Sequence, residues 1–288
     1  MMQIIKNKYI FLAISGLLVV AGIAAIVFFG LKPGIDFSGG VSWQLHFQGT
    51  VPARDEIAPL FSDAVITPQS GGNFLIRLKD LSETDRKAHL QQLNDSFGAV
   101  EELQFQNIGP VVGQDLKNKS VWAFILVLFA ISVYVAFAFR KVSRPVSSWK
   151  YGIITLITLF HDAIIPAGLF AILGKLFNAE MDTNFVVAIL VVMGFSVHDT
   201  IVVFDRIREN LRLSRVDKVD FNELVNVSVN QTMARSINTS FTLILTLLAL
   251  LFLGPSTLTF FVLTILVGTI VGTYSSIFVA SPLLTIWR

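Results

Sequence analysis

The sequence contains no cysteine among its 288 residues, which excludes disulfides and thiolate metal sites. Charge is scarce as well, because only 15% of the residues are charged, against about 25% in soluble domains. The formal net charge of +2 is too small to indicate nucleic-acid binding. Hydrophobic residues make up 53% of the chain. These values are typical of a polytopic membrane protein.

Long apolar runs dominate what is present. Six of them reach the roughly 20 residues that a helix needs to cross a bilayer. They lie near residues 10–30, 120–139, 151–173, 185–204, 236–254 and 259–281. The first exceeds the roughly 7–15 apolar residues of a signal peptide, and no clear small-residue cleavage site follows it. We therefore expect six retained transmembrane helices.

Basic residues are distributed unevenly over the loops, and this asymmetry predicts the orientation of the chain. One side has loops 140–150 and 205–235, with the basic residues Arg140, Lys141, Arg144, Lys150, Arg206, Arg208, Arg212, Arg215, Lys218 and Arg235. On the other side, loop 174–184 has one basic residue, Lys175, against Glu180 and Asp182, and loop 255–258 has no charge. Both termini are therefore expected in the cytoplasm.

Residues 31–119 then form one extracytoplasmic domain, between the membrane parts 1–30 and 120–288. Val41, Trp43, Leu45 and Phe47 alternate with polar neighbours, as in a half-buried strand. Similar patterns predict a helix at 53–61, strands at 64–67, 74–78 and 100–108, and a helix opened by a capping box at Ser82. The order βαββαβ predicts a small α+β domain of ferredoxin-like type.

Asp199 is the most unusual residue, because it lies inside the apolar run 185–204 next to His198. A carboxylate at membrane depth opposes insertion by roughly 2.5–3.5 kcal/mol, so it usually pairs, lines water or carries protons. Three interpretations stay open: a proton-carrying site, a static polar bond between helices, or a metal ligand.

A second pair, His161-Asp162, lies near the middle of the third helix. Two His-Asp pairs on neighbouring helices could form a two-metal site of an intramembrane hydrolase. No further histidine or glutamate in the six segments supports that site, so we expect no metal and no cofactor. We group His161, Asp162 and His198 with Asp199 as candidate proton-relay residues.

The fifth helix has a narrow polar stripe. Arg235, Thr239, Thr242 and Thr246 recur at helical spacing, with Asn238 beside them. The stripe could line a proton or water path, or its threonines could bond their own backbone. Arg235 completes the proton-relay candidates, because a fixed cation near Asp199 would hold the carboxylate ionised.

A charged motif follows the fourth helix, and the sixth helix has a ridge of small residues. The motif consists of Asp205, Arg206, Arg208, Glu209 and Asn210, whose charges make i,i+3 and i,i+4 pairs; taken alone it is typical of a solvated helix end. Gly268, Gly272 and Ser276 indicate close helix packing.

These motifs resemble the SecD/SecF family of bacterial protein export, on its SecF side. The resemblance rests on Gly34-Ile35-Asp36-Phe37-Ser38-Gly39-Gly40, on Gly109-Pro110-Val111-Val112-Gly113, on His161-Asp162, on residues 194–210 and on residues 231–236. It covers almost the whole chain. One helix, an external domain and five further helices match half of the plan of the resistance-nodulation-division superfamily.

The resemblance implies a function and partners. It implies a non-enzymatic subunit of the bacterial inner membrane that acts with SecD, the SecYEG channel and SecA-dependent translocation, with YajC as a further candidate partner. The pair would use the proton gradient to pull unfolded preproteins outward. Asp199 and Arg235 would be the family's membrane carboxylate and helix-five arginine, whereas His198 departs from the asparagine expected there.

Two alternatives remain. One is a proton-driven exporter of small molecules or lipids on the same half-transporter plan, whose soluble region would usually be larger. The other is a structural scaffold of the translocon, in which Asp199 and Arg235 would be dispensable.

Overall fold

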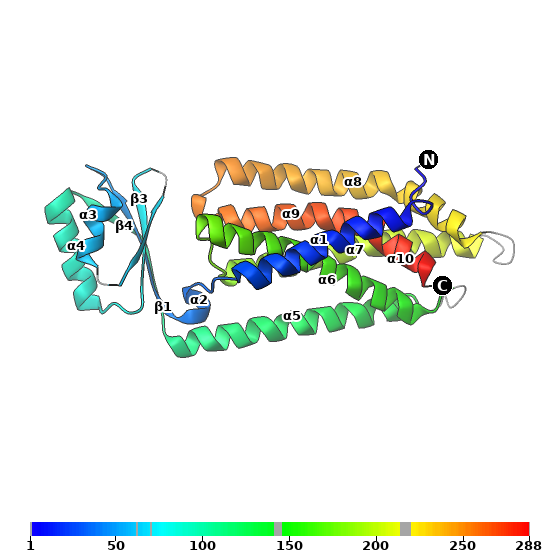
Figure 1. Cartoon of the computed structure of the whole chain (residues 1–288), viewed down its shortest axis with the longest axis horizontal. Coiled ribbons are helices and arrows are strands. Elements are labelled where there is room, and N and C mark those ends of the chain that lie inside the picture. Colours follow the sequence, from blue (N-terminus) through cyan, green and yellow to red (C-terminus); the bar gives the residue numbers. More distant parts are fainter. Residues whose placement is uncertain (1, 62, 70, 141–145, 214–219, 288) are drawn as a thin grey trace. The chain divides into compact units, whose positions relative to one another are not determined.

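The computed structural model describes residues 2–61, 63–69, 71–140, 146–213 and 220–287 (Figure 1). The chain divides into two compact units, Met1–Lys32 with Trp122–Arg288, and Pro33–Val121. The basic residues Lys141, Arg144, Arg215 and Lys218 lie outside the described residues.

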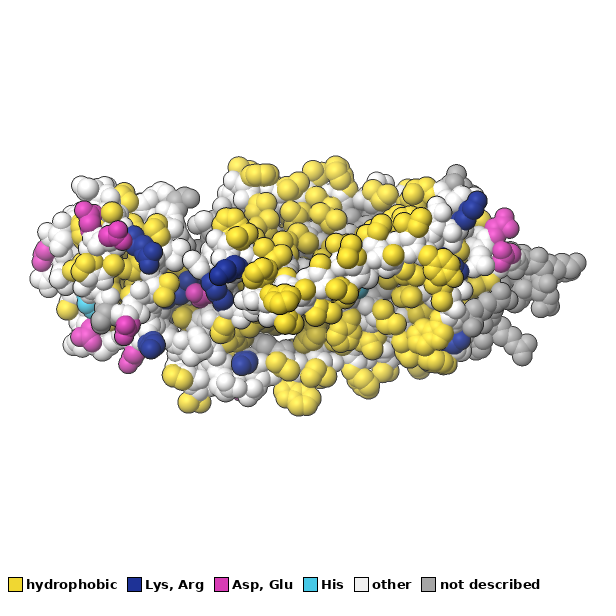
Figure 2. All heavy atoms as spheres, viewed as in Figure 1, with side chains coloured by type: hydrophobic (Ala, Val, Ile, Leu, Met, Phe, Trp, Pro, Cys, Tyr) yellow, Lys and Arg dark blue, Asp and Glu magenta, His cyan; other side chains and the backbone are white. Residues whose placement is uncertain are grey.

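Six helical spans in the described residues are long and apolar enough to cross a membrane, as predicted. They are α1 (Lys8–Phe29), α5 (Pro110–Ala138), α6 (Ser148–Phe177), α7 (Thr183–Leu213), α8 (Phe221–Leu253) and Ser256–Ile286. The observed helices α7 and α8 are longer than the predicted apolar runs because each continues into polar residues on the side of the termini. On the face in Figure 2, hydrophobic side chains cover these helices and charged ones lie near their ends.

The last span is not one regular helix. It consists of the 3₁₀ turn η2 (Ser256–Leu258), α9 (Thr259–Ser275), a π-helical turn η3 (Ser276–Ala280) and α10 (Ser281–Ile286). The Ser281 hydroxyl bonds to the carbonyl of Ser276, 3.3 Å away. π-helical turns inside α-helices are rare and are often found at functional sites.

The membrane helices pack around a centre formed by α6, α7 and α9, which contact one another. Helix α1 lies on α6, and α8 lies on α7 and α9. Helix α5 is the least buried of the six. The first and last described residues lie at the end of the bundle where α7 finishes and α8 begins (Figure 1). There, the Lys150 ammonium donates to the carbonyl of Trp287 and Lys8 donates to Thr285.

The second unit contains a four-stranded antiparallel sheet in the order β2-β3-β1-β4, which is the ferredoxin-like order that the sequence predicted. Its elements are α2 (Ile35–Ser38), β1 (Gly40–Phe47), α3 (Arg54–Ile57), η1 (Ala58–Leu60), β2 (Val65–Gln69), β3 (Asn73–Leu78), α4 (Glu83–Phe97) and β4 (Val100–Ile108). Val41, Trp43 and Leu45 are fully buried, as the alternation predicted. Ser82 caps α4 by accepting from the backbone N–H of Asp85. The sequence did not predict the short α2, nor that α5 already begins at Pro110 within this unit.

The two glycine-containing motifs that flank the sheet contact each other. Gly39 has a φ of +75°, and a Cβ there would lie 2.9 Å from the Cα of Pro110. A Cβ on Gly113 would lie 2.9 Å from the backbone nitrogen of Gly39. Glycine is therefore required at both positions, because a side chain at either one would separate α2 from the start of α5.

Candidate functional site

Asp199 lies on the buried side of α7 and is 6% exposed. It belongs to a stripe with Val192, Ser196 and Val203, all of which face the neighbouring helices. The hydroxyl of Ser236 on α8 donates to Oδ1 of Asp199 over 2.5 Å. The other oxygen, Oδ2, is buried without a hydrogen-bond partner among the described residues. A charged carboxylate in this position is costly unless a proton, water or cation reaches that open oxygen.

Asp162 is fully buried on α6, and its carboxylate has more hydrogen-bond partners than that of Asp199. Nδ1 of His161 lies 2.8 Å from its Oδ1. The hydroxyls of Ser196 on α7 and of Ser275 on α9 both donate to Oδ2, the latter over 2.7 Å. His161 is 4% exposed, and its Nε2 has no hydrogen-bond partner among the described residues. Three helices therefore meet at this carboxylate.

A hydroxyl cluster lies beside the two carboxylates. Ser276 and Thr200 are fully buried, and their hydroxyl oxygens are 2.9 Å apart. The Ser276 side chain also interacts with the carboxylate of Asp199. Ser196, Ser236 and Ser275 were not among the site residues predicted from the sequence. Their signal was their position: Ser196 lies one helical turn before Asp199, and Ser236 follows Arg235.

The small-residue ridge of the sixth span packs against α7, as predicted. A Cβ on Gly268 would lie 2.6 Å from Cγ1 of Val192, and one on Gly272 would lie 3.0 Å from Cβ of Ser196. Ser276 does more than pack, because its hydroxyl joins the cluster described above. Close approach of α9 thus brings its serines within reach of both carboxylates.

The predicted contact between Asp199 and Arg235 is wrong within this chain. The ion pairs found among the described residues do not include Asp199, and Arg235 is exposed on α8. Successive helical residues point about 100° apart. Because Ser236 faces α7, Arg235 must face away from it. Arg206, which follows Asp199 by seven residues on α7, bonds Glu209 at 2.6 Å and Gln231 at 2.7 Å.

The two His-Asp pairs do not converge. His198 is exposed on α7, whereas His161 is buried on α6 and uses Nδ1 on its own neighbour Asp162. Within the described residues, no group of three or more histidine or acidic side chains is arranged to hold a metal ion. The described part of the chain therefore offers no ligand set for the two-metal alternative.

The polar stripe of α8 faces outward. Asn238, Thr239, Thr242 and Thr246 are all exposed. Thr242 donates to the carbonyl of Thr239 over 2.8 Å, and Thr246 donates to that of Thr242 over 3.1 Å. These two threonines therefore bond their own backbone, and the stripe lines no path inside this chain.

The charged motif at the end of α7 ties helices together and is more than a solvated helix end. Arg206 and Asn210 both donate to the side-chain oxygen of Gln231 on α8. Arg208 donates to Asp205 and stacks its guanidinium over Phe139, just beyond α5, at 5.3 Å. The motif thus fixes α7 against α8 and the end of α5.

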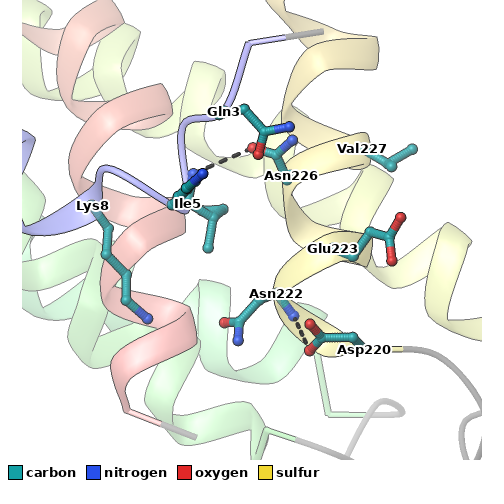
Figure 3. Close-up of a pocket in the computed structure, with 9 residues that line it drawn as sticks. Gln3, Ile5, Lys8, Asp220, Asn222, Glu223, Asn226 and Val227 are labelled. Atoms are coloured by element: carbon teal, nitrogen blue, oxygen red, sulfur yellow. Dashed lines mark hydrogen bonds between the residues drawn. The ribbon is translucent and has the colours of Figure 1, made fainter.

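A pocket of about 480 Å³ opens near the start of α8, between its first turns and the N-terminal segment (Figure 3). Lys6 and Lys8 line it together with Asp220 and Glu223, so both signs of charge are present. In Figure 3, Asn226 of α8 faces the N-terminal segment and accepts from the backbone N–H of Ile5. None of the candidate relay residues lines this pocket.

Comparisons with known proteins extend this picture. Residues 88–288 match the family described as "Protein export membrane protein SecD/SecF, C-terminal", and residues 24–51 match the "SecD/SecF GG Motif". The protein translocase subunit SecF of Thermobaculum terrenum is 45% identical over all of this chain and 94% of its own length. That of Anaerolinea thermophila is 37% identical, again over all of this chain and 94% of its length.

Solved structures agree. The crystal structure of SecDF from Thermus thermophilus, described as a translocon-associated membrane protein, has a TM-score of 0.85 at 35% identity. The match covers 98% of this chain but 38% of the longer SecDF chain. The chain therefore belongs to the SecD/SecF family of protein export membrane proteins, and it matches SecF translocase subunits over its whole length.

Proposed function

We propose that this chain is an accessory, non-enzymatic subunit of the Sec translocase that acts with a SecD partner. The pair would use the proton-motive force to drive late steps of preprotein translocation. Two findings support the partner: this chain is similar to 38% of the fused SecDF chain, and it has six membrane spans of its own. The remainder of such a fusion leaves room for a SecD half.

The observation that carries the proposal is the environment of Asp199. It is a buried carboxylate in a membrane helix, its neighbours are the hydroxyls of Ser236 and Ser276, and it forms no ion pair among the described residues. Such a group is suited to bind and release a proton, because neutralisation removes the energetic penalty of the unpaired charge.

The counter-charge for Arg235 would come from the interface with the SecD partner. His198 on α7 and Arg235 on α8 are exposed on this isolated chain. An arginine exposed on a membrane helix is expensive where it meets lipid, so a partner surface that covers it is favoured. We infer that SecD packs over this face and there supplies a group for Arg235.

The free energy released by one proton that crosses the membrane is sufficient to switch the helix bundle between two arrangements. One charge that crosses about 100 mV of membrane potential supplies about 2.3 kcal/mol. At about 1.4 kcal/mol for each factor of ten, this shifts a balanced two-state equilibrium by about fifty-fold. Protonation of Asp199 would remove the charge that strengthens its hydrogen bond with Ser236, the bond that joins α7 to α8, and so bias the bundle between two arrangements.

We place the chain in the bacterial plasma membrane with both termini in the cytoplasm. The basic residues Arg140, Lys150 and Arg208 support this orientation, since they lie at the end of the bundle that holds both termini. The SecYEG channel, the SecA-dependent translocase, YajC and unfolded preproteins would then be the remaining partners, the preprotein meeting the sheet-containing unit outside.

The test is an Asp199→Asn variant in inverted membrane vesicles. Asparagine keeps the shape and can still accept from Ser236 but cannot bind a proton. We expect gradient-stimulated export to fall to the level seen with the gradient dissipated, while export driven by ATP alone is unchanged. Asp95→Asn on the exposed face of α4 is the matched control and should have no effect. Full gradient stimulation in the Asp199 variant would refute the proposal.

A further inference from the structure

Asp162 is a second buried carboxylate, and the mechanism proposed above gives it no role in proton binding. It is fully buried, and its hydrogen bonds connect α6, α7 and α9, the three central helices. A purely structural polar bond between helices needs only one donor and one acceptor. Here a whole carboxylate is retained in the membrane, together with a histidine.

We propose that Asp162 binds a proton in its own right, received through His161, and that the adjacent hydroxyls of Ser275 and Ser276 couple it to Asp199. The proposal deepens the proposed function, because it adds a second proton site to the same bundle.

The geometry of His161 fits a relay. Its Nδ1 lies 2.8 Å from Oδ1 of Asp162, and its Nε2 is buried and unpartnered among the described residues. With Nδ1 protonated, the imidazole has a free lone pair at Nε2, a site for a proton delivered by water. When a proton binds at Nε2, the proton already on Nδ1 can pass to Oδ1 of Asp162. The carboxylate becomes a neutral acid, and the imidazole remains neutral as its other tautomer.

The coupling runs through two consecutive residues of the last span. Ser275 donates to Oδ2 of Asp162, while Ser276 interacts with the carboxylate of Asp199 and bonds Thr200. A shift or rotation of this short segment therefore changes the hydrogen bonding of both acids at once. The segment ends α9 and begins the π-helical turn, so its backbone is already irregular.

The surroundings of Asp162 contain few other titratable groups. On its own helix there is His161, on α7 there are Asp199 and the exposed His198, and on α9 there is Tyr274, whose ring stacks near His161 at 6.5 Å. The part of α1 that follows Tyr9 has no titratable side chain. A titrating carboxyl band from this position would therefore arise from Asp162 or Asp199, because imidazole and phenol groups give no such band.

The experiment is infrared difference spectroscopy of the full chain in its membrane complex, reconstituted in liposomes and titrated with acid. A protonated carboxyl gives a C=O band that its asparagine variant cannot give. We expect Asp162→Asn to remove one titrating band and Asp199→Asn to remove another. We also expect Asp162→Asn to shift the midpoint of the Asp199 band. Thr158→Val is the matched control on α6, because the Thr158 hydroxyl donates to the carbonyl of Thr155 and, among the described residues, to neither carboxylate; it should change neither band.

Two serine variants test the same proposal in case the Asp162→Asn protein does not fold. Ser275→Ala should shift the frequency of the Asp162 band alone, and Ser276→Ala should shift that of the Asp199 band. If no titrating band disappears in Asp162→Asn and none shifts in Ser275→Ala, proton binding at Asp162 is refuted. If the Asp199 midpoint does not move in Asp162→Asn, the coupling is refuted.

These outcomes are separate from the fate of the proposed function. Loss of export in Asp199→Asn with no band at Asp162 would overturn only the second site. A band at Asp162 with normal export in Asp199→Asn would instead overturn the proposed function and leave the second site standing.

Discussion

Replacing Gly268 by alanine should loosen the contact between α7 and α9 that brings the serines to the carboxylates. The new methyl carbon would lie 2.6 Å from Cγ1 and 3.0 Å from Cβ of Val192, well inside ordinary contact distances. Overpacking of this kind costs about 1–3 kcal/mol. Alanine also favours a helix over glycine by about 1 kcal/mol, so the net change in the free energy of unfolding needs a control.

Gly194 supplies that control, because it lies on α7, and a Cβ there has nothing within 4 Å. Gly194→Ala gains the same helix preference without the overlap. The Gly268→Ala protein should therefore be less stable than the Gly194→Ala protein by about 1–3 kcal/mol. Unfolding in mild detergent, followed by circular dichroism, measures the difference.

A double-mutant cycle identifies the cause. Val192→Ala removes the two methyl carbons that the new side chain would meet, so Gly268→Ala should be much better tolerated in that background. A coupling energy of about 0.5–3 kcal/mol is expected for residues in direct contact. Equal stability of the Gly268 and Gly194 variants, or no coupling to Val192, would show that α9 does not approach α7 as described.

Two further predictions concern other parts of the chain. Asn226→Ala should free the N-terminal segment, because the Asn226 carboxamide oxygen accepts from the backbone N–H groups of Ile4 and Ile5 at 2.9 and 3.3 Å. Loss of these bonds, worth about 1–3 kcal/mol, should speed hydrogen exchange at residues 2–5, with Asn222→Ala as an unaffected control; unchanged exchange would contradict the contact. In the sheet unit, Trp43→Ala should cost about 3–5 kcal/mol. Trp43→Phe should cost clearly less, since it also removes a buried Nε1–H with no partner among the described residues; equally low unfolding temperatures for the two variants would contradict this.

The six spans and the ferredoxin-like order were predictable because their signals are local. Twenty apolar residues in a row, or the alternation of Val41, Trp43 and Leu45, already specify which surface must leave water. The burial of Asp199 also followed, since a carboxylate in an apolar helix avoids lipid.

The partners of the carboxylates were not predictable. Whether Arg235 or Ser236 faces Asp199 depends on which side of α8 packs on α7, and the composition of α8 does not decide this. The serines of α9 reach Asp162 only because Gly268 and Gly272 allow close approach, which is a relation between helices distant in the sequence. Serine and threonine side chains also add little to the hydrophobic periodicity from which the buried face of a helix is predicted.

The wide turn at Ser276–Ala280 allows the last span to satisfy two demands that a regular helix could not meet together. The Ser275 hydroxyl must point at Asp162 on α6. Nine residues later, Leu284 must fill the hydrophobic cluster that contains Phe204 and Val225. The extra residue in the turn absorbs the angular mismatch between these positions. Deleting one residue there would restore uniform winding and rotate one of the two contacts out of place, so we expect the length of this short stretch to be constrained as well as its side chains.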